Sequence, residues 1–241
     1  MSNWPRLSRA PVVEALIDIR VATIATECVP KLMVLAEGSA AEFPKRQIRS
    51  RARTEVRFAA PSAPAVSASE SDDGVVMRSA DGLWVVQLHL EGVTVSRLQP
   101  YGEWAELRAM AQRWWERYRE AVGAQLATRV ATRFINRVPL PDGVPFDRTF
   151  STTFVLGPNL PPAVASYLLR CILPFQAEQA VAVVTQALEG GPECLFDIDV
   201  FSEHAAGLSA EQIWSRVDQL REVKNRVFFG SLTDQAVESL R

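Results

Sequence analysis

The chain has 241 residues, of which 48% are hydrophobic and 22% charged, and its formal net charge is −2. This composition is typical of a globular protein, and the charge argues against a general attraction to nucleic acid or anionic membranes. Three widely spaced cysteines and two histidines indicate neither a disulfide framework nor a zinc site, so we expect no metal and no cofactor. Because there is no signal-peptide core and no apolar run of membrane-spanning length, we expect a cytoplasmic protein that does not contact a membrane.

The first half of the sequence predicts a sheet flanked by two helices. Apolar and charged residues alternate in VVEALIDIRV (residues 12–21), which predicts a strand with one charged face. Apolar residues at three-and-four spacing predict helices over residues 28–43 and 101–122. Three short strands are expected between residues 75 and 99. The stretch 59–73, rich in Pro, Ala and Ser before an acidic turn, is expected to be mostly loop.

The central segment QLATRVATRFINRV (residues 125–138) predicts the clearest strand of the chain. Its period of two places Arg129, Arg133 and Arg137 on one face. Guanidinium groups on a covered face require carboxylates, water or an anionic ligand. We expect at least two of the three to form ion pairs with carboxylates of other predicted strands, which are Glu14, Asp18, Asp197 and Asp199.

The second half predicts further strands and helices. Residues 150–157 read as a strand, and a helix is expected to begin within residues 158–173, after paired prolines. A strand pair, residues 179–189 and 193–203, follows around a Gly-Gly turn. The residues Ser209 and Gln212 form a capping box that opens a long helix, and a short helix ends the chain.

The order of these elements predicts an α+β fold in which an antiparallel sheet is covered by helices. Residues 1–123 and 124–241 each run strand, helix, two or three strands and a tryptophan-bearing helix. This similarity suggests two pseudo-repeated β-α-β-β-β-α halves that form one continuous globular unit.

Four segments resemble a sporadically distributed bacterial protein family of unknown function. They are PVVEALIDIRV, PYGEWAELRAMAQRWWERY, RFINRV and KNRVFFGSLTD, and together they span almost the whole chain. The resemblance implies a single fold and offers no catalytic motif to transfer. The patchy distribution of that family implies an association with mobile or antiphage-defence genes.

Two groups of residues are candidates for binding sites. The first is the row Arg129, Arg133 and Arg137 with Asp197 and Asp199, which would suit an anionic ligand, a hard cation or acid–base chemistry. The second is a basic segment that would suit phosphates, with the candidates Lys45, Arg46, Arg49, Arg51 and Arg53. For both groups the alternative is structural: an ion network in the first case and a solvated or protein-docking face in the second.

Neither a nucleophile motif nor a phosphate-binding glycine loop occurs in the sequence. We therefore expect a non-enzymatic subunit of an intracellular assembly, with a protein partner or a second copy. The alternatives are a binder of small or anionic ligands, an enzyme, and a nucleic-acid-binding protein. We further expect Trp104, Trp114 and Tyr118 to be core residues. Unequal burial of Trp114 and Trp115, and the apolar segment 227–229, would favour self-association.

Overall fold

The computed structural model describes residues 4–57, 65–123, 125–140, 146–154, 156–160 and 164–241. It is organised around one nine-stranded antiparallel sheet with the order β2-β3-β4-β5-β1-β6-β9-β8-β7, which confirms the expected α+β class. The strands are β1 (Val12–Val21), β2 (Lys45–Arg57), β3 (Ala65–Arg78), β4 (Trp84–His89), β5 (Gly92–Leu98), β6 (Ala127–Pro139), β7 (Ser166–Phe175), β8 (Ala180–Glu189) and β9 (Glu193–Leu208). The helices are α1 (Val29–Glu37), α2 (Trp104–Val122), α3 (Ala210–Ser231) and α4 (Asp234–Ser239), with 3-10 turns η1 (Thr26–Cys28) and η2 (Phe146–Arg148).

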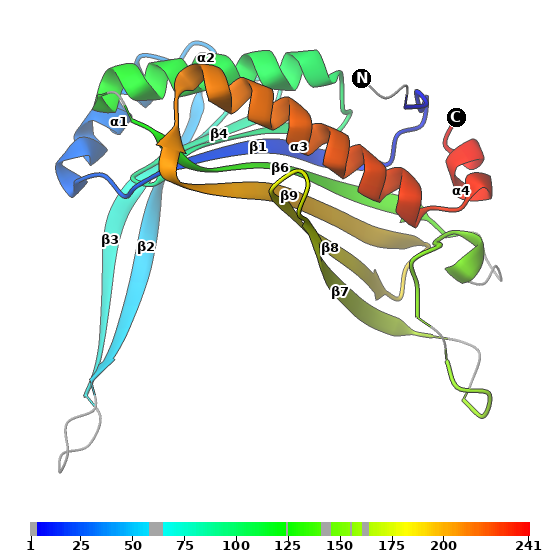
Figure 1. The fold of residues 1–241 in the computed structure, drawn as a ribbon. Helices are drawn as coiled ribbons and strands as arrows, with labels where there is room; N and C mark the ends of the chain where they lie inside the picture. The colour runs from blue at the N-terminus through cyan, green and yellow to red at the C-terminus, as the bar shows by residue number, and fades with distance from the viewer. Residues whose placement is uncertain (1–3, 58–64, 124, 141–145, 155, 161–163) are drawn as a thin grey trace.

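The two long helices lie on the same face of the sheet (Figure 1). Phe134 of β6 shows this directly, since its ring lies 6.3 Å from that of Trp104 on α2 and 4.0 Å from the Nζ atom of Lys224 on α3. Helix α1 packs against β3 and α2 on that side. Among the described residues no helix covers the opposite side, which we call the helix-free face. None of the described helices is both long enough and apolar enough to cross a membrane.

The strand order has an internal symmetry about the central pair β1 and β6. Moving outward from β1, the sheet continues with β5, β4 and β3; moving outward from β6, it continues with β9, β8 and β7. Helix α2 follows β5, and α3 follows β9. The second half nevertheless departs from the expected repeat, because it has no counterpart of α1 among its described residues.

The expected helix within residues 158–173 is wrong. Its described C-terminal part belongs to β7, which pairs with β8 from Ser166–Glu189 to Phe175–Ala180. Backbone pairing along a whole strand outweighs the weak helical preference of SYLLRCIL. The expected strand at residues 150–157 is also wrong, since the described residues there form only an isolated bridge between Phe150 and Leu232.

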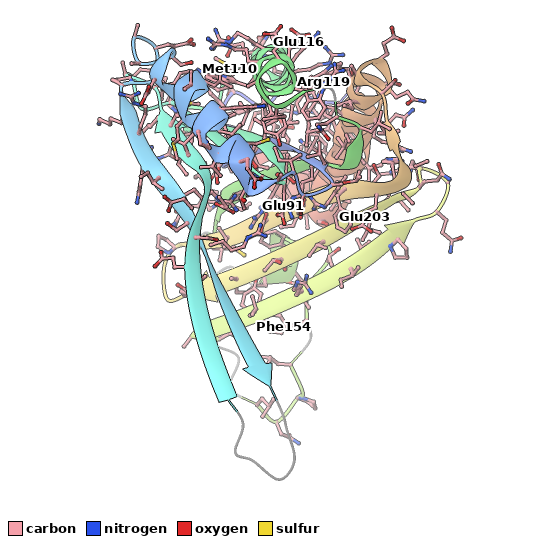
Figure 2. The ribbon with its side chains drawn as sticks, turned by 90° about the vertical axis from the view of Figure 1, so that its left-hand side faces the viewer. Glu91, Met110, Glu116, Arg119, Phe154 and Glu203 are labelled. Atoms are coloured by element: carbon pink, nitrogen blue, oxygen red, sulfur yellow. The ribbon has the colours of Figure 1, made fainter. Side chains whose placement is uncertain are left out.

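The expected loop at residues 59–73 is also largely wrong. Strand β3 begins at Ala65 and pairs with β2 from Arg57–Ala65 to Lys45–Arg78, while residues 58–64 lie outside the described part. Figures 1 and 2 show this β2–β3 hairpin extending away from the helices, beyond the rest of the sheet. The basic segment is therefore an edge strand whose conformation is set by its neighbour.

Helix α2 provides the centre of the core. Trp114 and Trp115 are both completely buried, as are Leu107 and Tyr118, whereas Trp104 is half-buried. The edge-on contact of Phe43, which follows α1, with Trp114 at 5.3 Å covers α2 on a second side. Equal burial of two adjacent tryptophans requires cover on two sides of the helix, and here a single chain provides that cover.

The apolar segment 227–229 is also covered by its own chain. Val227 and Phe228 are buried, and Phe229 stacks on Trp4 of the N-terminal segment at 5.2 Å. Neither this segment nor the tryptophan pair now argues for self-association.

Candidate functional site

The predicted arginine row lies on the helix-free face, between carboxylates of two neighbouring strands. Strand β6 pairs with β1 on one side and with β9 on the other. The register places Arg133 opposite Asp199 and Ile135 opposite Asp197 on β9. On β1, Asp18 lies opposite Ala131, between Arg129 and Arg133. Since directly opposed residues share a face, the pleat alone brings these charges together.

Two of the three arginines form close ion pairs, as expected. The Nη1 atom of Arg129 donates to Asp18 at 2.7 Å, and its Nη2 atom donates to Asp199 at 3.4 Å. Arg133 binds both oxygens of Asp197, with Nε donating at 2.8 Å and Nη2 at 2.6 Å. Such two-point pairs are the strongest arginine–carboxylate contacts.

Side-chain exposure increases from Arg129 to Arg137, so the ion pairs of the three arginines differ in strength. The side chain of Arg129 is 19% exposed, that of Arg133 42% and that of Arg137 60%. Among the described carboxylates, Arg137 contacts only Glu193, at 3.7 Å. The row is therefore a firm ion network at one end and a solvated charge at the other.

The electrostatics of this network favour a structural role. Burial raises the pKa of Asp199, and the guanidinium of Arg129 opposes that effect. Hydrogen bonds to Asp197 raise the pKa of Arg133. Asp18 also accepts from the Nε atom of Arg20 at 2.9 Å and from the Thr94 hydroxyl at 2.7 Å. An external anion at Arg129 or Arg133 would have to compete with the carboxylates of the chain itself.

Both histidines make hydrogen-bond contacts within the chain, which favours a structural role over a role as a general base. His89 is buried, and its Nδ1 atom accepts a hydrogen bond from the Glu91 backbone N–H at 3.3 Å. Burial, together with the positive charge of Arg49, lowers the pKa of His89 to about 4. His204 lies 2.9 Å from the Ser202 hydroxyl through Nε2, and burial lowers its pKa. The described residues contain no group of three or more His, Cys, Asp or Glu placed to hold a metal ion.

The basic candidates on β2 are partly neutralised. Arg49 lies 3.0 Å from Asp73, and Arg51 lies 2.8 Å from Glu91. Lys45 and Arg46 are exposed, and the side chain of Arg53 lies outside the described part. Two of the five charges are held by carboxylates, whereas Lys45 and Arg46 remain exposed, so the described part of this strand keeps some positive charge available to a phosphate backbone.

A further surface feature, missed from the sequence, is the edge strand β7. Leu168 is 73% exposed and Ile172 58%, and both lie on the helix-free face, opposite Ala187 and Val183 of β8. Arg170 lies between them on the same face, exposed and without an ion pair among the described residues. Leu168, Arg170 and Ile172 recur at every second position, which places them on one face of a strand, but the residues between them, Leu169 and Cys171, are also apolar, so no polar–apolar alternation marks this strand.

Comparison with known proteins adds no functional assignment: no protein-family model matches the chain, and a search of curated proteins finds no significant match. The resemblance suggested by the four sequence motifs therefore stays a prediction.

Proposed function

We propose that this protein is a non-enzymatic interaction subunit and that strand β7 is its docking edge. The observation that carries the proposal is the exposure of Leu168 and Ile172 on the outermost strand of the sheet. No described strand pairs with the outer side of β7, so the backbone groups on that side are available to another strand. Large apolar side chains beside an open edge support strand addition by a partner.

The chemistry of β7 favours one kind of occupant, an extended acidic segment of another protein. A segment with the pattern apolar–x–acidic–x–apolar would cover Leu168 and Ile172 and place its carboxylate opposite Arg170. A second copy of this chain fits less well. Antiparallel pairing about the middle of β7 would bring two Arg170 side chains together, and like charges facing each other across strands are destabilising.

The ion pairs of the central strands argue against acid–base catalysis there, and this favours a binding function at β7. Asp197 and Asp199, the carboxylates considered for acid–base work, are held by Arg133 and Arg129. Neither is therefore free to exchange a proton with a substrate without first losing its partner.

The test uses the full chain to recover a partner from its native host and then measures binding with the purified partner. We expect Ile172→Lys to weaken binding by at least about tenfold, because it places a charge in an apolar contact. Hydrogen exchange of the complex should slow at β7 and not at β2, the other edge of the sheet.

Val34→Lys is the matched control, since Val34 on α1 is 66% exposed and lies on the helix-covered side. Both substitutions alter exposed positions, so neither should lower the thermal midpoint. Equal binding by the wild type, Ile172→Lys and Val34→Lys would refute the assignment of β7. If the isolated wild-type chain forms oligomers and the Ile172→Lys variant is monomeric, the occupant of β7 is a second copy of this chain, and the choice of an acidic partner is refuted.

A further inference from the structure

A cavity of the described chain lies on the helix-covered side, away from the β7 docking face. It has a volume of about 1320 Å³ and lies among the N-terminal segment, residues 99–105, strand β6 and helix α3. Aromatic rings contribute much of its wall, with Trp4, Tyr101, Trp104, Phe134, Phe228 and Phe229 among the lining residues. Polar and apolar atoms contribute about equally to its wall, so the cavity combines aromatic faces with polar groups that can orient a small molecule.

The N-terminal segment is fixed over this cavity by specific contacts. The indole N–H of Trp4 donates to Glu222 at 2.9 Å, and its ring stacks on Phe229. The backbone N–H of Arg9 donates to the carbonyl of Leu240 at 3.0 Å. The wall formed by this segment is therefore tied to α3 and to the end of α4.

Lys224 supplies the cavity with a cation that lacks an anionic partner. Its Nζ atom lies 4.0 Å from the centre of the Phe134 ring, and no described carboxylate lies within ion-pair distance. The neighbouring Glu222 is engaged by Trp4 and lies 4.0 Å from Arg221. The residue as a whole is only partly buried, and desolvation of its ammonium group lowers the pKa of Lys224 to about 7.

Asn136, another residue of the cavity lining, has a buried acceptor without a partner. The residue is 1% exposed, and its Nδ2 atom donates to the carbonyls of Phe196 at 2.9 Å and Phe134 at 3.2 Å. These two bonds fix the amide, and its Oδ1 atom is buried without a hydrogen-bond partner. Buried polar atoms are normally satisfied, so an unpaired acceptor on a cavity wall points to an absent donor.

We propose that the cavity binds an aromatic monocarboxylic acid that carries a hydroxyl or N–H donor. The carboxylate pairs with Lys224, the aromatic body lies among the rings of Tyr101, Trp104 and Phe134, and the donor meets Asn136. Arg6 and Arg9 also line the cavity, but Arg6 is paired with Glu103, and the cation that lies against the Phe134 ring is Lys224. One ammonium group at that ring suits a monoanion, whereas a phosphate group usually requires several converging donors. Arg221, stacked over Trp104 at 5.3 Å, adds positive charge at the same wall.

Three rigid probes test each part of this proposal by isothermal titration calorimetry on the full chain. The first, 6-hydroxy-2-naphthoic acid, has both the carboxylate and the donor. The second, 2-naphthoic acid, lacks the donor, and the third, methyl 6-hydroxy-2-naphthoate, lacks the charge. We expect the first to bind and the other two to bind at least about tenfold more weakly, as for the loss of one charge-assisted or buried hydrogen bond.

Lys224→Met retains the length of the side chain and removes its charge, and it should weaken the first probe at least about tenfold. Lys31→Met, at an exposed lysine of α1, is the control and should bind like the wild type. Because Lys224 has no carboxylate partner among the described residues, its removal leaves no buried carboxylate unpaired, and the variant should keep the thermal midpoint. This separates a binding defect from misfolding. No binding of 6-hydroxy-2-naphthoic acid up to about 1 mM, or unchanged binding by Lys224→Met, would overturn the proposal. Substitutions in β7 leave this cavity intact. Failure of the proposed docking at β7 can therefore be distinguished from failure of the proposed ligand binding in the cavity.

Discussion

Replacing Arg133 by Met is the sharpest test of the ion network on the helix-free face. The substitution keeps an unbranched apolar stem and removes a guanidinium that binds both oxygens of Asp197. An exposed ion pair contributes at most about 1 kcal/mol, whereas breaking a buried pair costs about 3–5 kcal/mol. The Asp197 side chain is 15% exposed and the Arg133 side chain 42%. The variant therefore strands a largely buried carboxylate, and we expect a loss of about 2 kcal/mol, between the two limits.

The opposite change should cost less. Asp197→Asn leaves Arg133 without its main partner, but that guanidinium is already part-exposed and can be hydrated, so we expect a loss of about 1 kcal/mol. The double variant Arg133→Met with Asp197→Leu removes both charges, and it should recover at least half of the loss caused by Arg133→Met.

Urea unfolding at pH 7 followed by circular dichroism measures these free energies. Arg137→Met is the matched control on the same strand, because Arg137 is 60% exposed and only 3.7 Å from Glu193. Its expected cost is at most about 0.5 kcal/mol. Equal stabilities for the Arg133 and Arg137 variants would refute the reasoning. Unchanged stability of Arg133→Met with loss of a cellular activity would instead identify the row as a binding site.

The remaining predictions concern pH and the core. Below pH 6.5 the unfolded chain takes up a proton on His89 that the folded protein accepts only near pH 4, so the free energy of unfolding should fall as the pH is lowered through this window, by at most about 3 kcal/mol. His89→Gln should flatten this pH dependence. Comparing the variant with the wild type isolates the contribution of His89 from that of Asp199, whose raised pKa acts in the opposite direction. Parallel pH profiles of the two proteins would contradict the role of His89. Trp114→Ala should cost about 3–5 kcal/mol because the side chain is completely buried, and an unchanged thermal midpoint would show that the tryptophan is not a core residue.

The charged residues of the candidate site could be predicted from the alternation of side chains along single strands. Arg129, Arg133, Asp197 and Asp199 lie on strands with strong two-residue periodicity, so their common orientation was readable without a structure. Which arginine meets which carboxylate depends on the register between strands whose paired residues are 64 to 111 positions apart, and that register follows from the packing of the whole sheet. The sequence therefore predicts which charged residues share the face, but it does not predict which arginine pairs with which carboxylate.

Lys224 was missed for a different reason. It lies beside Val223 and between the buried positions Leu220 and Val227 of α3, so a charge on the core side of the helix was its only signal. A cavity arises where segments distant in sequence fail to fill the space between them. Here those segments are the N-terminal arm, residues 99–105, β6 and α3, and no local pattern reports such a gap.

The sequence by itself determined the elements whose stability is local or strongly periodic. Helix α2, the capping box that opens α3, and the strand β6 all lie close to their expected positions, because caps and apolar periodicity act within a few turns. Tertiary structure decided β3 and β7, whose residues have loop-like or helical preferences and become strands by pairing with β2 and β8. Backbone hydrogen bonds to a neighbouring strand are gained only when that neighbour is in place, so the partner strand, and not the local sequence, fixes the conformation of these two.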